Sequence, residues 1–154
     1  MEPNQILNVA SERLTVFKKT ISESNTDEIK LEIRLGDSFL YFFKVYDNFK
    51  NLKSFKENED FLNGIQQIWN AFKHNQKIIL IEHHKPFILD NSLLDGKDFL
   101  GGSTKWMENI AGSGRNQKGK LSKAFSSKVC PMPVLDTIDM LIKITNDAIF
   151  ELNN

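Results

Sequence analysis

The stretch from residue 112 to residue 128 carries residue types that bind phosphate. It holds five basic residues and no acidic residue, together with three glycines and four serines. Glycine lets backbone N–H groups approach an anion, lysine and arginine add positive charge, and serine adds hydroxyl donors. A solvated loop whose charge balances acids elsewhere is the competing interpretation. The candidate phosphate-binding residues are Gly114, Arg115, Lys118, Gly119, Lys120 and Lys123.

Within this segment, Gly114 to Lys120 matches the start of a P-loop, but the motif is incomplete. The next residue is Leu121, whereas a P-loop has Ser or Thr there to hold magnesium. The preceding residues have a helical pattern, and a P-loop should follow a buried strand. Phe125 is the only aromatic residue of the segment, so stacking with bases is poorly supported. The segment therefore indicates phosphate contact, with nucleic acid or nucleotide as the ligand class, and not a true P-loop.

Titratable side chains also follow an apolar run near the middle of the chain, at Glu82, His83 and His84. Adjacent residues of a strand face opposite sides, so the two histidines are poorly placed to bind one metal ion. No standard ligand spacing joins them to His74 or to the acidic residues of 90–98. Either histidine could act as a general base near pH 7, but a strand that turns polar at the solvent is the simpler interpretation. The sequence predicts no metal site, no cofactor and no catalytic residue set.

Cys130 is the only cysteine of the chain, so it cannot form an intramolecular disulfide. Lys128 lies close in sequence and could lower the pKa of the thiol. Pro131 and the apolar neighbours instead favour a half-buried structural thiol. A reactive thiol is therefore the weaker hypothesis.

Both tryptophans are candidates for an interface, because tryptophan is enriched among residues that dominate binding energy. Trp69 lies on an apolar helical stripe and is predicted to be in the core. Trp106 stands beside the basic segment with few apolar neighbours in sequence. We therefore expect Trp106 to be exposed and to be the candidate residue for contacting a partner.

The strongest strand signal lies directly ahead of the two histidines. Residues 78–81 are four consecutive apolar residues, three of them β-branched, which favours a strand covered on both faces. Residues 28–35 alternate between apolar and charged side chains, which is typical of a strand with one wet face. Gly36 and Asp37 would then form a hairpin turn before a second, largely apolar strand. The predicted sheet contains 28–35, 39–46 and 77–83.

Apolar residues recur every three or four positions in three other stretches, which predicts amphipathic helices at 4–21, 60–74 and 134–152. Gly64 weakens the second helix and suggests a close contact there. A short helix is predicted at 104–111, and the stretch after it is expected to be irregular. The fold class is α+β, a small mainly antiparallel sheet with the three helices packed on one face. The residues expected to be mostly buried are Ile33, Phe42, Ile65, Trp69, Ile79, Leu80, Ile81, Leu141 and Ile142.

Length and charge limit the classes of function. The 154 residues suit a single globular domain, 1–154, which buries roughly 70% of the surface of its unfolded chain. Lysine plus arginine and aspartate plus glutamate balance at 20 each, so no global field steers the protein to nucleic acid or to a membrane. The N-terminus lacks the pattern of a signal peptide, and no apolar run approaches the ~20 residues that span a bilayer. We expect a cytoplasmic protein.

Two classes of function remain open. The first is a non-catalytic binding protein of the adaptor, inhibitor or toxin-neutralising type, which contacts another protein. The second is a binder of phosphate-bearing ligands, nucleic acid or nucleotide, through 112–128. An enzyme built on His83 or His84 ranks behind both. The identity of the partner and the oligomeric state stay undetermined at this level.

Overall fold

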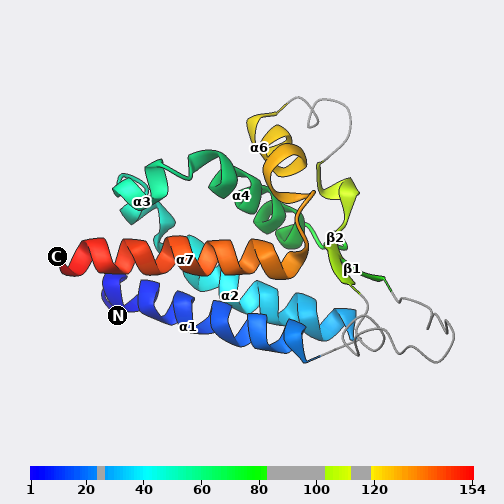
Figure 1. The fold of residues 1–154 in the computed structure, drawn as a ribbon, viewed down its shortest axis with the longest axis horizontal. Helices are drawn as coiled ribbons and strands as arrows, with labels where there is room; N and C mark the ends of the chain where they lie inside the picture. The colour runs from blue at the N-terminus through cyan, green and yellow to red at the C-terminus, as the bar shows by residue number, and fades with distance from the viewer. Residues whose placement is uncertain (24–26, 83–102, 112–118) are drawn as a thin grey trace, which may run out of the picture.

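Long helices build most of the molecule. The computed structural model describes residues 1–23, 27–82, 103–111 and 119–154. Helix α1 packs against both α2 and α7, and the three run side by side along the molecule (Figure 1). Helix α4 lies in a second layer above them, together with the shorter helices. The bounds of the long helices are α1 Pro3–Ser22, α2 Glu28–Phe49, α4 Glu59–Lys73 and α7 Val134–Asn153.

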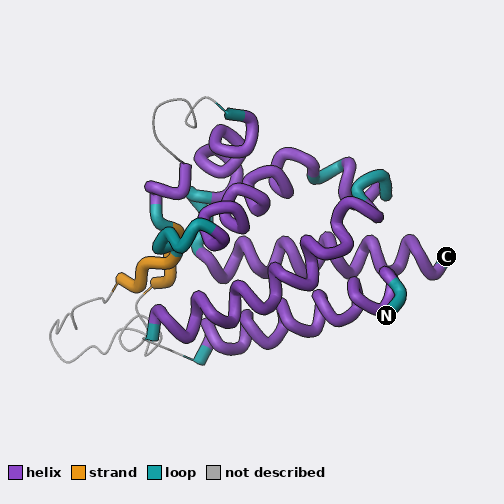
Figure 2. The backbone as a smooth tube through the Cα atoms, turned by 180° about the vertical axis from the view of Figure 1, so that it is seen from behind, coloured by secondary structure: helices purple, strands orange, loops and turns teal. Residues whose placement is uncertain are grey.

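The shorter elements complete the second layer and one end of the molecule. Strands β1 and β2 form an antiparallel pair in which Ile79 lies opposite Trp106 and Glu82 opposite Ser103. This pair lies at the end of the molecule opposite to the chain termini (Figure 2). The fold is therefore a small α+β fold, as the sequence predicts. The short elements are α3 Lys53–Lys56, β1 Ile79–Glu82, β2 Ser103–Trp106, the 3₁₀ helix η1 Glu108–Ala111, α6 Lys120–Ala124 and the π-helical turn η3 Phe125–Val129.

The three predicted amphipathic helices are confirmed with small differences at their ends, as α1, α4 and α7. Their apolar stripes are buried; Leu14, Ile65 and Leu141, for example, are fully inaccessible to solvent. The predicted close contact at Gly64 is also present. A Cβ atom there would lie 2.5 Å from Cγ2 of Val129 in η3, so the missing side chain lets α4 and η3 approach closely.

The two strands predicted at 28–35 and 39–46 are wrong, because both stretches lie inside helix α2. Asp27 is the N-cap of the helix, and its side chain accepts a hydrogen bond of 3.1 Å from the backbone N–H of Lys30. The buried apolar residues recur at intervals of three and four, which is the period of a helix. They are Leu31, Leu35, Phe39, Phe42, Val45 and Phe49.

Gly36, predicted to open a hairpin turn, lies instead in the interior of α2. A Cβ atom at this position would lie only 2.2 Å from Cζ of Phe72, so the ring of Phe72 rests directly on the helix backbone. The glycine therefore allows the end of α4 to contact α2.

The strand predicted at 77–83 is present as β1, although it is shorter and His83 lies outside the described residues. It pairs with β2, and its other edge faces α2. The side chain of Glu32 accepts hydrogen bonds from the backbone N–H groups of Ile78 at 3.0 Å and Ile79 at 3.3 Å. Glu28 accepts from the N–H of Ile81 at 3.2 Å. The two carboxylates of α2 thus accept hydrogen bonds from backbone N–H groups that would otherwise pair with a further strand.

Two expectations for the second half of the chain are also wrong. The short helix predicted at 104–111 is replaced by β2 followed by η1. The part of the basic segment from Lys120 onward is helical and not irregular, because Phe125 and Val129 are fully buried against α4. Apolar anchoring therefore orders the second half of this segment.

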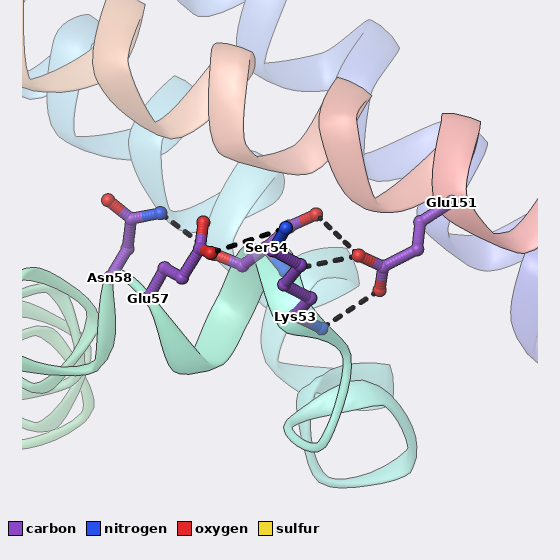
Figure 3. A network of polar contacts seen from close by, with 5 residues as sticks. All are labelled: Lys53, Ser54, Glu57, Asn58 and Glu151. Carbon is purple, nitrogen blue, oxygen red and sulfur yellow. Dashed lines mark hydrogen bonds and ion pairs between the residues drawn. The ribbon is translucent and has the colours of Figure 1, made fainter.

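A polar network fixes α3 to the end of α7, as Figure 3 shows. The carboxylate of Glu151 accepts hydrogen bonds from the backbone N–H groups of Lys53 at 2.9 Å and Ser54 at 3.3 Å. It also accepts from the hydroxyl of Ser54 at 3.2 Å. Because α3 has no cap from its own preceding residue, Glu151 supplies the missing acceptor from a distant part of the chain.

The predicted core is largely confirmed. Phe42, Ile65, Ile79, Ile81 and Leu141 are buried. Three further residues of the predicted set are half-buried, namely Leu80, Trp69 and Ile142. Ile33 is the exception, because it is exposed on α2. Among the described residues, no helix is both long enough and apolar enough to span a bilayer.

Candidate functional site

A cleft of about 510 Å³ lies between the C-terminal half of α4 and the start of α6. One wall comes from α4 and the turn that follows it, the other from η1 and the first residues of α6. Polar side chains dominate the lining. The lining residues are Gln67, Asn70, Ala71, His74, Gln76, Ile110, Gly119, Lys120, Leu121 and Ser122.

The predicted phosphate-binding residues divide into three groups. Gly119 and Lys120 line the cleft. Lys123 is exposed but is not part of the lining. The remaining three, Gly114, Arg115 and Lys118, lie outside the described residues.

The ammonium group of Lys120 already has a partner, because its Nζ lies 3.4 Å from Oε1 of Glu59 on α4. Both side chains are largely exposed, so this ion pair contributes little to stability and breaks easily. On the other side of the cleft, Nε2 of Gln67 donates a hydrogen bond of 2.8 Å to the carbonyl of Ile110. That bond ties η1 to α4 and shapes the wall of the cleft.

Trp106, expected to be an exposed anchor for a partner, is buried with 3% of its surface accessible. Its indole Nε1 donates a hydrogen bond of 2.9 Å to Oγ1 of Thr137. The hydroxyl of Thr137 in turn donates to the carbonyl of Pro133 at 3.0 Å. The prediction is wrong because Trp106 belongs to the hydrophobic core, whose other members come from distant parts of the chain. Its position ties β2 to the start of α7.

Of the three titratable residues at the end of β1, Glu82 lies within the described part of the chain and takes part in an ion pair. Glu82 pairs with Lys105 across the two strands at 2.8 Å. His83 and His84 lie outside the described residues, as do the acidic residues of 90–98. Within 1–23, 27–82, 103–111 and 119–154, no three residues of the metal-binding types lie close enough together to hold an ion.

Cys130 is half-buried, as predicted. Burial raises the pKa of its thiol, and the carboxylate of Glu108 raises this pKa further. The nucleophilic thiolate is therefore scarce near neutral pH, which disfavours a reactive cysteine.

A second candidate surface lies on α2, and the sequence interpretation missed it. Ile29, Ile33 and Leu40 expose 74%, 62% and 52% of their surface. Their spacing of four and seven residues places them on one side of the helix. The ring of Phe72 rests on Gly36, between Ile33 and Leu40 in the helix. Large apolar side chains thus follow one another along this side.

A row of aromatic rings continues this surface toward α4. The ring of Trp69 stacks on Phe43 with centroids 5.8 Å apart, and on Phe72 with centroids 5.7 Å apart. All three rings are half-buried. We call the combined surface the α2 apolar face; it consists of Ile29, Ile33, Leu40, Phe43, Trp69 and Phe72.

Lysines border the α2 apolar face. Lys30 precedes Ile33 by three residues, and Lys44 follows Leu40 by four, so each lies one helical turn from an exposed apolar residue. The ammonium group of Lys73 lies 5.7 Å from the ring centroid of Trp69. No ion pair among the described residues involves these three lysines.

The acidic groups of α2 near this face are engaged. Asp37 pairs with Arg13 at 3.6 Å, Glu28 with Lys77 at 2.8 Å, and Asp47, seven residues after Leu40, with Lys50 at 3.6 Å. The carboxylate of Glu32 accepts hydrogen bonds from β1. The border of the face therefore presents positive charge to an incoming molecule.

Family models, curated proteins and solved structures give no match to this chain. The two candidate sites, the cleft and the α2 apolar face, are thus described by their own geometry. The sequence did contain a signal for the face. Ile29, Ile33 and Leu40 follow a helical spacing, but the alternation of 28–35 assigned Ile29 and Ile33 to the buried side of a strand.

Proposed function

We propose that the protein is a non-catalytic binding protein that contacts another protein through the α2 apolar face. The observation that carries this proposal is the exposure of Ile29, Ile33 and Leu40 on one side of α2, beside the stacked rings of Trp69 and Phe72. Contiguous exposed apolar surface is uncommon on monomeric proteins and marks interaction sites. Covering it with a partner removes that surface from water, which favours binding.

The partner is an amphipathic segment, apolar on one side and acidic at its edges. Its apolar side would cover Ile33, Leu40 and Trp69, and its acids would pair with Lys30, Lys44 and Lys73. Charge complementarity of this kind speeds association and excludes wrong partners. A second copy of this chain fits poorly, because a two-fold contact would bring the same lysines close to one another.

The absence of a catalytic role is part of the proposal and is supported by the structural roles of three carboxylates. Glu28 and Glu32 satisfy the edge of β1, and Glu151 satisfies the start of α3. Adaptor, inhibitor and toxin-neutralising proteins act by binding a partner protein and need no catalytic group. A cytoplasmic location belongs to the same proposal.

Site-specific photo-cross-linking tests the proposal. A photoreactive phenylalanine analogue at position 40 should capture a partner in cells, and the same analogue at position 150 serves as a control. Phe150 is a suitable control because it is an exposed apolar residue of another helix, α7. The captured protein is then identified and purified, and its affinity for the wild-type protein is measured.

Two substitutions decide whether that partner uses the α2 apolar face. Ile33→Glu should weaken its binding by roughly tenfold or more, because it places a charge inside an apolar contact. Phe150→Glu should leave the affinity unchanged. Equal effects of the two substitutions, or no effect of Ile33→Glu, would contradict the proposal. The double variant Lys44→Glu with Lys73→Glu should weaken the binding of an acidic partner and reduce the dependence of its affinity on salt.

A further inference from the structure

We propose that the cleft between α4 and α6 binds a small organic phosphate, at a site separate from the α2 apolar face. Its volume of about 510 Å³ falls within the range of roughly 300–1,000 Å³ that holds small ligands in proteins. The described lining contains Lys120 and His74 and no acidic residue. A cleft with basic and neutral polar side chains favours an anion over a cation.

The neutral lining residues suit the rest of such a ligand. Asn70 and Gln76 carry amide groups and Ser122 carries a hydroxyl group, and all three can donate hydrogen bonds. Gln67 is held by its bond to the carbonyl of Ile110. Ile110 and Leu121 add apolar contacts. This mixture matches a phosphate monoester with an organic group attached better than it matches inorganic phosphate alone.

Glu59 competes with the ligand for Lys120, the only lysine among the described lining residues. The Lys120–Glu59 pair joins two exposed side chains at 3.4 Å, and Glu59 itself does not line the cleft. A bound phosphate dianion offers Lys120 stronger charge-assisted hydrogen bonds than an exposed carboxylate does. Lys120 would therefore leave Glu59 when the ligand binds, and breaking this pair lowers the affinity of the free protein for its ligand.

A neighbouring polar group supports the assignment. Asn63 follows Glu59 by four residues and precedes Gln67 by four, so the three lie on one side of α4. The side-chain nitrogen of Asn63 is buried and has no hydrogen-bond partner. Buried donors without partners are rare in folded proteins. Asn63 does not itself line the cleft, but the side of α4 that carries Gln67 thus holds an unsatisfied donor one helical turn away.

Titrations of the ¹⁵N-labelled protein test this assignment. The probes are adenosine 5′-monophosphate, ribose 5-phosphate, adenosine and a single-stranded ten-nucleotide DNA. The two monophosphates should shift the backbone resonances of His74, Gly119, Lys120 and Ser122, and adenosine should not. If no probe shifts these resonances at millimolar concentration, or if adenosine shifts them equally, the proposal is wrong.

Three variants sharpen the test. Lys120→Ala should weaken monophosphate binding about tenfold, and Glu59→Gln should strengthen it several-fold, because it removes the internal competitor. Lys123→Ala is the matched control, because Lys123 belongs to the same helix but not to the cleft, and it should change nothing. Equal losses in Lys120→Ala and Lys123→Ala, or binding of the DNA alone, would indicate diffuse attraction to surface charge and would overturn the proposal.

Discussion

The two sides of helix α2 carry equally large apolar residues but differ in what covers them. Leu31, Leu35 and Phe42 are fully inaccessible to solvent, whereas Ile29 and Ile33 expose 74% and 62% of their surface. Hydrophobicity does not distinguish the two sets. The difference lies in their neighbours: other helices pack on the first side, whereas among the described residues only rings from α4 reach the edge of the second. Apolar side chains that the described part of the chain leaves uncovered are the residues from which an interface can be built.

The largest difference between the two sides should appear in stability. Phe42→Ala should lower the free energy of unfolding by about 3–5 kcal/mol, because the buried ring leaves a cavity among Tyr46 and Phe55. Leu40→Ala, on the exposed side, should cost less than about 1 kcal/mol. Urea denaturation followed by circular dichroism measures both. Similar losses for the two variants would mean that the exposed side is covered in solution.

Gly36 tests the edge between the two sides. An added methyl group would lie 2.2 Å from the ring of Phe72, and overpacking of this kind costs roughly 1–3 kcal/mol. Alanine also favours a helix by about 1 kcal/mol relative to glycine. We therefore expect Gly36→Ala to lower the free energy of unfolding by at most about 2 kcal/mol.

The double variant Gly36→Ala with Phe72→Ala provides the control for this prediction. Removing the ring removes the clash, so Gly36→Ala should be neutral or stabilising in the Phe72→Ala background. The same destabilisation in both backgrounds would show that Phe72 does not contact Gly36 in solution.

Glu32 tests the contact between α2 and β1. Glu32→Ala should cost about 1–3 kcal/mol, because the backbone N–H groups of Ile78 and Ile79 lose their acceptor. Glu32→Gln should cost less, since an amide oxygen can still accept. Hydrogen exchange should become faster at both amides in the alanine variant and less so in the glutamine variant. Unchanged exchange in the alanine variant would contradict the contact.

The fold could be predicted from the sequence where the apolar residues followed a single period. The stripes of α1, α4 and α7 repeat every three or four residues and have no competing pattern, and these helices are present as predicted. In 28–35 two periods coexist. Leu31 and Leu35 fit a strand and a helix equally well, and the alternating charges made the strand more plausible. Packing of α2 on α1 decides the outcome, and that contact is not local in sequence.

The candidate sites were predictable only in part. Gly119 and Lys120 were recognised by residue type, and they do line a cleft. His74 and Asn70 could not be assigned to it, because the fold brings α4 to α6 across some 45 residues of chain. Trp106 failed as an interface residue for the same reason, since its partners Thr137 of α7 and Ile79 of β1 are both distant from it in sequence.

The smallest effect on stability is expected at the centre of the α2 apolar face. Ile33→Gln should change the free energy of unfolding by no more than about 0.5 kcal/mol, because the side chain is exposed and glutamine is at least as good a helix former as isoleucine. The same substitution should nevertheless weaken the binding of the proposed partner, because it removes an apolar contact. Substituting a core residue has the opposite effect. It lowers the stability of the protein first, and binding weakens only because less of the protein is folded. Urea denaturation and an affinity measurement on one preparation separate the two cases. If Ile33→Gln costs more than about 1 kcal/mol, Ile33 is already covered in the free protein, and the apolar side of α2 is then part of the core and not an interface.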